Sequence, residues 1–431
     1  MGLRPEQGLP AAGYGNYSRR TLRIDVPPNP HPMKPLRILP LVLLPLLPAC
    51  RGAEAPGDAA TVRDSAGIQI VQNQSGQWKE GEGWRLSDEP TLRIGVAEGE
   101  AAYQLDRVRT ALRLGDGRIA LANAGSQEIR LYDAAGTHLG SSGGQGGGPG
   151  EFQSLGALLR LPGDSLLAYD PSGFRLSWMD PSGRFVRSVQ LQPLGEVPPR
   201  FVDRFADGSM LLSRSTRSFG ADIPDGIRRD TLQWLRMAPG GAMDSLPVTP
   251  GGESHFAIHR SGGQITGMNV MTLPFMRNVQ TAAAGDGYWQ GTNDSYEVVL
   301  RGMDGTARRI VRRSVQPVPV KGAYLDSLRS VQAAEMGDAA MKGLDQVPVP
   351  ESLPAFERLL VDDTGHLWVL QTTWPGHVQP AWDVFDAEGR MLGTVRLPAR
   401  FRATHVGGDF ILGVGRDEND VEQVRMYRLV K

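Results

Sequence analysis

Cysteine is almost absent from this chain of 431 residues, in which Cys50 is the only one. A single cysteine excludes an intramolecular disulfide and a metal site built from several thiolates. Net charge is almost absent too, because 46 Lys and Arg residues stand against 47 Asp and Glu residues. So balanced a charge gives no basic surface for a phosphate backbone, and we expect no nucleic-acid partner.

The chain also has no sequence run typical of a membrane-spanning helix. The apolar stretch "ILPLVLLPLLPA" covers only residues 38–49 and contains three prolines, whereas a spanning helix needs about 20 apolar residues. The basic residues Lys34 and Arg37 precede this stretch, and Cys50 follows it. A basic start, a short apolar run and a small residue before the break are typical of a signal peptide for export.

The end of this stretch, Leu47-Pro48-Ala49-Cys50, resembles the lipobox of bacterial lipoproteins, in which the cysteine becomes the lipidated N-terminus. The resemblance implies lipidation of Cys50 and attachment to the bacterial cell envelope, at the outer membrane or the periplasmic face. We therefore expect 1–32 to be a disordered upstream extension, 33–50 the lipoprotein signal peptide and 51–63 a flexible tether. The alternative is an ordinary signal peptide followed by a chance cysteine.

Glycine and proline, by contrast, are abundant, with 54 and 32 residues, while patterns of long helices are few. Over 64–431 a unit recurs six times, combining an Asp-Gly turn with short apolar strands; 114–144 and 161–191 are two copies. Repetition at this period is typical of sheets arranged around an axis. The sequence therefore predicts an all-β fold, a six-bladed β-propeller with four-stranded blades.

The sixth unit leaves little room for an outer strand, because the chain ends at Lys431. We expect an N-terminal strand to pair into this last blade and close the ring, since an open blade would expose a row of backbone donors and acceptors. Two segments have suitable alternation, 66–71 and 90–96. The sequence does not decide between them.

The stretch "GGQGGGPGEF", residues 143–152, has the glycine content of a phosphate-binding loop. Such a loop leads into a helix, whereas here another Asp/Gly turn and another strand follow, so we exclude a nucleotide site. Together with "EIRLYDAAGTH" before it, the stretch resembles the NHL-repeat type of six-bladed β-propeller. The resemblance implies that the glycines form a connector between blades, and we expect Phe152 to insert between neighbouring blades.

Two insertions lengthen the repeat, at about 249–275 and 320–356. We expect the first to be a long loop or a hairpin. The second has helical spacing from about residue 324 to 341 and lies between the fourth and fifth blades. Insertions on a rigid scaffold often carry function, although either one could simply cover an apolar surface.

The mouth of the predicted central channel is the candidate site. If the strand after each Asp-Gly turn is the innermost one, the polar residues that end these strands converge there. These residues are Asn123, Asp170, Arg214, Asn293, Gln371 and Arg416. One carboxylate and two arginines suit an anionic or polar ligand better than a cation. A hydrated channel without a ligand is the alternative.

No catalytic residue and no cofactor follow from the sequence. Lactonase-like propellers, which are similar to the predicted fold, hold a divalent metal at the channel mouth, and this resemblance leaves a metal as a second possibility. His255 and His259 have the spacing of a metal pair on a helix, but glycines flank them. We therefore expect surface histidines in a loop.

Together these patterns favour a monomeric, lipid-anchored binding module of the cell envelope. Its partner would be a protein, a peptide or a polar ligand, and the membrane would be reached through the N-terminal lipid. The alternative is a metal-dependent hydrolase or lyase of the lactonase-like type, with its site at the channel mouth.

Overall fold

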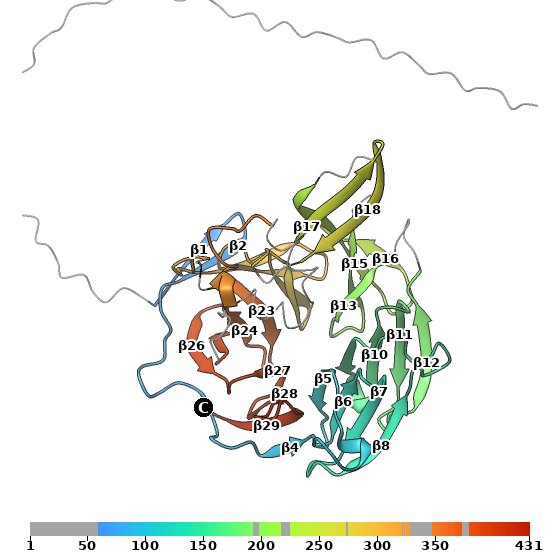
Figure 1. Ribbon diagram of the computed structural model, residues 1–431. Helices are drawn as coiled ribbons and strands as arrows, with labels where there is room; N and C mark the ends of the chain where they lie inside the picture. Colours follow the sequence, from blue (N-terminus) through green and yellow to red (C-terminus); the bar gives the residue numbers. More distant parts are fainter. Residues whose placement is uncertain are drawn as a thin grey trace, which may run out of the picture. The chain divides into compact units, whose positions relative to one another are not determined.

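Figure 1 presents the computed structural model of the chain. The structure describes residues 59–192, 198–216, 225–272, 275–320, 322, 324–327, 347–372 and 379–431. All of them belong to one compact unit, Pro56–Lys431. The predicted extension, the predicted signal peptide with Cys50, and most of the predicted tether lie outside the described residues.

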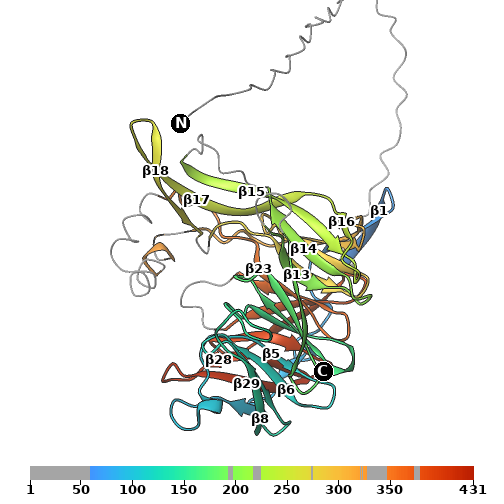
Figure 2. The ribbon, with the colours of Figure 1, turned by 90° about the vertical axis from the view of Figure 1, so that its right-hand side faces the viewer.

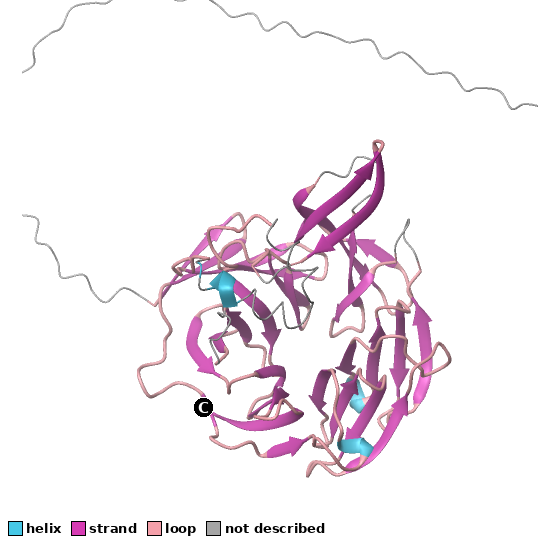
Figure 3. Ribbon diagram, in the orientation of Figure 1, coloured by secondary structure: helices cyan, strands magenta, loops and turns pink. Residues whose placement is uncertain are grey.

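The unit is all-β, as the sequence predicted (Figure 3). Helical residues in the described part of the chain are limited to two short 3-10 helices, η1 (Ala101–Tyr103) and η2 (Pro162–Asp164), and to positions 322 and 324–327. The predicted helix over 324–341 lies outside the described residues apart from 324–327.

The described strands form six sheets. We number the sheets in chain order from residue 108 onward, and the strand of each sheet that comes first after this point is called its first strand. Three of them have four antiparallel strands. The first sheet contains β5 (Val108–Arg113), β6 (Ile119–Asn123), β7 (Glu128–Tyr132) and β8 (His138–Gly143). The second contains β9 (Ala157–Arg160), β10 (Leu166–Asp170), β11 (Arg175–Met179) and β12 (Phe185–Gln190). The fifth contains β23 (Phe356–Val361), β24 (Leu367–Gln371), β25 (Ala381–Phe385) and β26 (Met391–Arg396).

The other three sheets carry extra strands. The third contains β13 (Arg200–Arg204), β14 (Met210–Ser215), β15 (Gly226–Met237), β16 (Met243–Ser245), β17 (Thr249–Ser261) and β18 (Gln264–Met271). The fourth contains β19 (Gln280–Ala284), β20 (Gly287–Gly291), β21 (Glu297–Gly302) and β22 (Ala307–Arg313), extended by β1 (Ala60–Ser65) and β2 (Ile68–Asn73). The sixth contains β27 (Phe401–Val406), β28 (Phe410–Arg416) and β29 (Glu422–Val430), completed by β3 (Arg85–Leu86) and β4 (Leu92–Ile94).

The outer hairpin of the first sheet has a turn built from an Asp and a Gly. Between β7 and β8, Asp133 Oδ1 accepts hydrogen bonds from the backbone N–H groups of Ala135 and Thr137, at 2.9 and 2.7 Å. Gly136 in the same turn has φ of 91°, a conformation that glycine adopts without steric cost. The carboxylate therefore replaces backbone partners that a tight turn leaves unpaired.

Each sheet shares a hydrophobic cluster with the next one. Between the first and second sheets, Ile129 and Leu131 pack with Leu155 and Leu158. Similar clusters join the second sheet to the third, the third to the fourth, the fourth to the fifth and the fifth to the sixth. A further cluster joins the sixth sheet back to the first. The sheets thus follow one another in a closed ring, the arrangement of a β-propeller (Figure 1).

The first strand of each sheet lies nearest the centre of this ring. Strand β5 contacts β9 and β27, and β19 contacts β13 and β23. Residues of all six first strands line one cavity, which we call the central cavity. In chain order, each of these strands comes before the short turn with Asp or Gly. The second strands, which follow that turn, lie one place farther out.

The glycine-rich connector between the first and second sheets behaves as predicted. Phe152 is fully buried in the cluster between these sheets. Gly143 has φ of 107°, and a Cβ atom there would lie 2.8 Å from the backbone oxygen of Gln127. Arg175 on β11 donates hydrogen bonds to the backbone oxygens of Gly147 and Gly148. The connector is therefore a packed structural element whose carbonyls are held by a side chain of the next sheet.

The N-terminal strands take two different places. Strand β4, from the 90–96 candidate, pairs antiparallel with β29 and so completes the sixth sheet, with Val424 opposite Ile94. The other candidate, 66–71, contributes β2, which pairs in parallel with β22 of the fourth sheet. One candidate therefore closes the last sheet, and the other extends a different one.

Between these two strands the chain contacts the fifth sheet. The backbone N–H of Trp78 donates to the oxygen of Leu392 on β26, at 2.8 Å. The fully buried Asn73 accepts from the backbone N–H of Met391 (2.8 Å) and donates to the oxygen of Gly389 (3.0 Å). Residues 59–94 thus form a strap along the fourth, fifth and sixth sheets, drawn in blue in Figure 1.

The first predicted insertion contains a long hairpin. Strands β17 and β18 pair antiparallel, and the first half of β17 pairs with β15. The hairpin projects from the rest of the third sheet, as Figure 2 shows.

Candidate functional site

The six residues that the sequence analysis placed at the channel mouth do not line the central cavity. Five of them lie on the second strands, and Asn293 follows the second strand β20 by two residues. The prediction took the strand after each Asp-Gly turn as the innermost one, but in the structure the strand before the turn occupies that place. The residues are therefore one strand too far out.

The side chains of three of the six residues accept hydrogen bonds from backbone N–H groups. Asn123 Oδ1 accepts from the N–H of Asp106 (2.9 Å), and Asn293 Oδ1 accepts from the N–H of Asn278 (2.8 Å). Asp170 accepts from four backbone N–H groups, those of Gln153, Ser154, Ser172 and Gly173. The three side chains are at most 3% exposed. In each sheet the bond fixes the segment that leads into the first strand, so these residues build the repeat.

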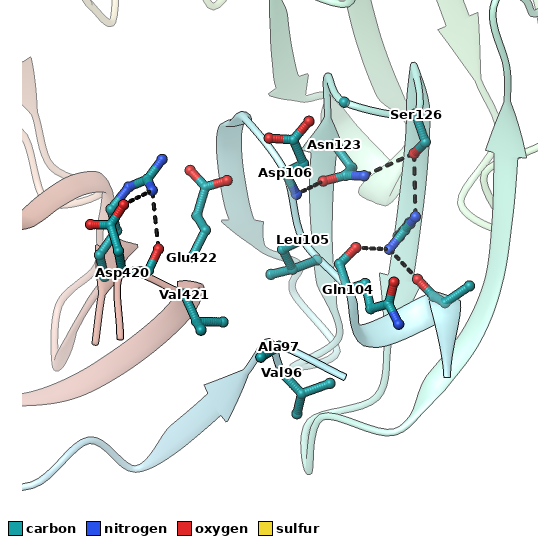
Figure 4. Close-up of a pocket in the computed structure, with 14 residues that line it drawn as sticks. Val96, Ala97, Gln104, Leu105, Asp106, Asn123, Ser126, Asp420, Val421 and Glu422 are labelled. Atoms are coloured by element: carbon teal, nitrogen blue, oxygen red, sulfur yellow. Dashed lines mark hydrogen bonds and ion pairs between the residues drawn. The ribbon is translucent and has the colours of Figure 1, made fainter. Parts of the chain in front are cut away.

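Asn123 and Arg416 line a second cavity of about 600 Å³, where the sixth sheet meets the first (Figure 4). Asp106 and Asn123 lie on one wall, and Glu422 lies across from them (Figure 4). Arg416 pairs with Asp420 at 2.8 Å, and Glu422 Oε2 accepts from the N–H of Val108 at 3.1 Å. Arg416 and Glu422 therefore already have partners within the protein, at the place where the sixth sheet meets the first.

Gln371 lines a third cavity, described below, and Arg214 lines none of the three. The structure therefore brings together only two of the six predicted residues.

The central cavity measures about 570 Å³. Each of the six first strands contributes at least one polar residue to its lining. These polar residues are Thr110, Arg160, Asp203, Arg204, Gln280, Thr281, Arg358 and Thr404. A cavity of this size on the axis of the ring accommodates a small molecule.

Irregular pairing shapes four of the first strands. The register shifts in β5 and β23 directly after the first residue, and in β13 and β27 farther along the strand. Bulges of this kind change the direction of nearby side chains and are common next to binding sites. Asp203, Arg358 and Thr404 lie at these shifts. At such a shift the side chains no longer alternate regularly between the two faces of the sheet.

Some of these side chains also link neighbouring first strands. Thr404 Oγ1 donates to the backbone oxygen of Ala111 at 2.8 Å, and so joins β27 to β5. Arg358 Nη1 donates to the oxygen of Ala403 at 3.0 Å, which joins β23 to β27. Since β-sheet hydrogen bonds do not cross from one sheet to the next, these bonds help to hold the centre of the ring.

Arg358 brings an uncompensated positive charge into the cavity. Burial, helped by repulsion from Arg402, lowers the pKa of Arg358 to about 10. Within the described residues neither Arg358 nor Arg204 forms an ion pair, whereas Arg160 is paired with Asp164 at 2.7 Å. A guanidinium that has lost water and gained no carboxylate attracts an anion strongly.

Asp203 is the one carboxylate among the described residues that line the central cavity. Its two oxygens accept backbone hydrogen bonds from Ala283 and Arg204, each at 2.8 Å. Burial raises the pKa of Asp203 above its ordinary value, because the charged form loses hydration. With Arg204 and Arg358 unpaired, the lining carries more positive than negative charge.

Sequence reasoning missed Asp203, Arg204 and Arg358, although a signal for them exists. They stand in the segments immediately before "FADG" and "VDDTG". Reading each repeat from three to five residues before the Asp of its Asp-Gly turn would have found them.

The donor set of the central cavity does not suit a divalent metal. Catalytic metals in proteins need three or more oxygen, nitrogen or sulfur ligands, and this lining offers one carboxylate among three arginines. Elsewhere in the part of the chain that the structure describes, no three His, Cys, Asp or Glu side chains come close enough to hold an ion.

The two spaced histidines lie on a strand and not in the expected loop. His255 and His259 both belong to β17, and His255 is only 8% exposed. The prediction of two surface histidines is wrong for His255, because β17 pairs on both sides.

Comparisons with solved structures concern the fold. A DUF4221-family protein from Bacteroides vulgatus has a TM-score of 0.50 at 10% identity, over 81% of this chain and 99% of that one. A gluconolactonase from Xanthomonas campestris has 0.41 at 11%, over 80% and 100%. An inactive variant of virginiamycin B lyase from Staphylococcus aureus has 0.40 at 10%, over 81% and 100%. At sequence identities this low, the comparisons show a similar fold and do not show a shared activity.

No protein-family model and no curated protein matches the chain by sequence. The NHL-type resemblance and the lipobox therefore stay predictions. None of the helices among the described residues has the length and apolar content needed to span a membrane.

Proposed function

We propose that this chain is a lipid-anchored protein of the bacterial cell envelope whose six sheets are the blades of a propeller, and that it binds a small anion in the central cavity. The observation that carries the proposal is the pair of arginines, Arg204 and Arg358, which line the cavity without an ion pair in the described residues. Of the three partners that the sequence left open, this favours a polar ligand over a protein or peptide.

The chemistry of the ligand follows from the guanidinium group. Arginine binds carboxylate, sulfate or phosphate oxygens with two parallel hydrogen bonds. The interior of the cavity screens such a contact less than open solvent does. Thr110, Gln280 and Thr281 add neutral groups for further oxygen atoms of the ligand.

Calorimetric titration of the full chain with sulfate, phosphate and citrate, at constant ionic strength in a chloride buffer, tests the proposal. We expect at least one of the three to bind, and Arg358→Met to weaken that binding at least tenfold. Arg63→Met is the matched control, because Arg63 is exposed on β1 and lies outside the cavity lining. Equal affinities for the Arg358→Met variant and the unaltered chain would contradict the proposal.

The lipid anchor needs a separate test. Mass spectrometry of the mature protein, expressed in a bacterium with two membranes, should detect an N-terminal Cys50 carrying acyl chains. Cys50→Ser should release the protein from the membrane fraction. An unmodified N-terminus at another residue would end this part of the proposal without affecting the anion site.

A further inference from the structure

The third cavity lies between the fourth and fifth sheets and shares no lining residue with the central cavity. It is the largest of the three described, at about 730 Å³. Its lining comes from the loop before β21, from the segment after β22, from the segment before β23 and from the end of β24. Among the residues of this lining are Tyr296, Arg313, Val315, Val318, Leu353 and Gln371.

A buried carboxylate lies behind this lining and binds three of its residues, Tyr296, Arg313 and Gln371. Asp383 on β25 is fully buried. It accepts hydrogen bonds from the hydroxyl of Tyr296 (2.7 Å), the amide of Gln371 (2.7 Å) and the hydroxyl of Thr394 (2.8 Å). Arg313 Nη1 is its fourth donor. Three neutral donors thus share the stabilisation of the carboxylate with one guanidinium.

This network fixes Arg313 at the wall of the cavity. Its guanidinium lies 5.7 Å from the centre of the Tyr296 ring, and its side chain is still 22% exposed. Among the described residues only Nη1 has a side-chain partner, so Nε and Nη2 are the atoms that a ligand in the cavity would contact. Asp294, a carboxylate that does belong to the lining, is already held by two hydrogen bonds of 2.7 Å from Arg229.

Two segments form an apolar part of the lining, and polar residues such as Ser314, Gln316 and Ser352 lie among them. Val315, Pro317 and Val318 come from one segment, and Leu353 and Pro354 from another. The two segments pair, because the N–H of Leu353 donates to the oxygen of Val318 at 2.8 Å. The prolines offer no N–H donor, so one part of the cavity presents hydrocarbon and the part near Arg313 presents hydrogen-bond donors.

We propose that this third cavity binds an amphiphilic carboxylate, a small molecule whose carboxylate contacts Arg313 and whose aliphatic chain lies against Val315, Val318 and Leu353. The burial of an aliphatic chain supplies the affinity, and the guanidinium selects the acid over the alcohol or the amine. The site is independent of the anion site in the central cavity.

Titration of the full chain with octanoate, octanol, octylammonium and acetate tests the proposal. We expect octanoate to bind at least tenfold more tightly than octanol, and acetate and octylammonium not to bind here. Comparable binding of octanoate and octanol would overturn the role of Arg313, and no octanoate binding would overturn the site.

A variant at the edge of the cavity avoids disturbing Asp383, which the loss of Arg313 would leave unpaired. Val315 is 37% exposed, so Val315→Glu should fold normally and weaken octanoate binding at least tenfold by repelling its carboxylate. Val62→Glu, at a valine that is 45% exposed on β1, is the matched control and should change nothing. Unchanged octanoate affinity in Val315→Glu would refute the site.

The two anion sites can be told apart. Arg358→Met should leave octanoate binding unchanged, and Val315→Glu should leave sulfate binding unchanged. Loss of octanoate binding in Arg358→Met would mean that octanoate occupies the central cavity, and would overturn this proposal.

Discussion

Polar side chains at the ends of the second strands and polar side chains on the first strands differ in what surrounds them. Asp170 and Asn293 are saturated by backbone groups, whereas Arg204 and Arg358 face the central cavity without an ion pair in the described residues. The first group stabilises the ring and the second is available to a ligand. Polarity at equivalent places of a repeat therefore does not by itself identify a binding site.

Removal of Asp170 should have the largest effect. Asp170→Ala leaves four backbone N–H groups without their acceptor, and we expect it to lower the free energy of unfolding by about 3–5 kcal/mol. Urea denaturation measures this. Asp170→Asn keeps one acceptor oxygen and should recover part of the loss. A loss below about 1 kcal/mol in Asp170→Ala would mean that the connector is held by other contacts.

Removal of Asn123 should cost less, because its hydrogen bonds are between neutral groups. Asn123→Ala loses one bond from the N–H of Asp106 and one to the hydroxyl of Ser126. We expect the free energy of unfolding to fall by about 1–2 kcal/mol while sulfate affinity stays the same. A loss of sulfate affinity without a loss of stability would place Asn123 in the ligand site and reverse the comparison.

Sulfate binding should strengthen as the pH is lowered toward the raised pKa of Asp203. The raised pKa of Asp203 means that this carboxyl takes up a proton at a higher pH than an exposed aspartate, while sulfate keeps its charge. Loss of the negative charge makes the cavity more positive, so we expect an affinity several-fold higher at the lower pH. Titration of Asp203→Asn is the control and should give tighter binding with little pH dependence.

The same shift affects stability with a defined sign. Because the folded state holds the proton of Asp203 more tightly than the unfolded state does, protonation favours folding. This contribution is present at low pH and is lost as the pH rises through the raised pKa.

Arg358→Met should have the smallest effect on stability even though it should remove anion binding. It deletes one hydrogen bond to Ala403, and it also deletes the cost of burying an unpaired charge. We expect the free energy of unfolding to change by less than about 1 kcal/mol in either direction. A loss comparable to that of Asp170→Ala would mean that Arg358 is structural, and the contrast between the two groups would disappear.

The fold class was predictable because its determinants are local. Turns with Asp and Gly, short alternating strands and the buried Phe152 in the connector are all visible in the sequence and present in the structure. The phase of the repeat was not predictable in the same way, since a periodic pattern has no marked first strand. The prediction therefore chose residues of the second strands, one strand farther from the axis than the residues that line the central cavity.

The N-terminal strands show a second limit. The segments 66–71 and 90–96 have equally suitable alternation, and only the contacts of distant residues decide their places. Val71 lies beside β22 and Ile94 beside β29, which are 240 and 330 residues away (71 to 311, and 94 to 424). The lining of the third cavity depends on pairings between distant segments too, and of its residues the sequence analysis singled out Gln371 alone.

The strap formed by residues 59–94 has a mechanical consequence. A pull on the chain ahead of β1 would act first on the β1–β2 hairpin at the fourth sheet, then on the contacts with β26, and only last on β4, the strand that closes the sixth sheet. The β1–β2 hairpin would detach before the strand that closes the sixth sheet. If the protein is attached to a membrane at this end, a force on the attachment would therefore leave the ring closed.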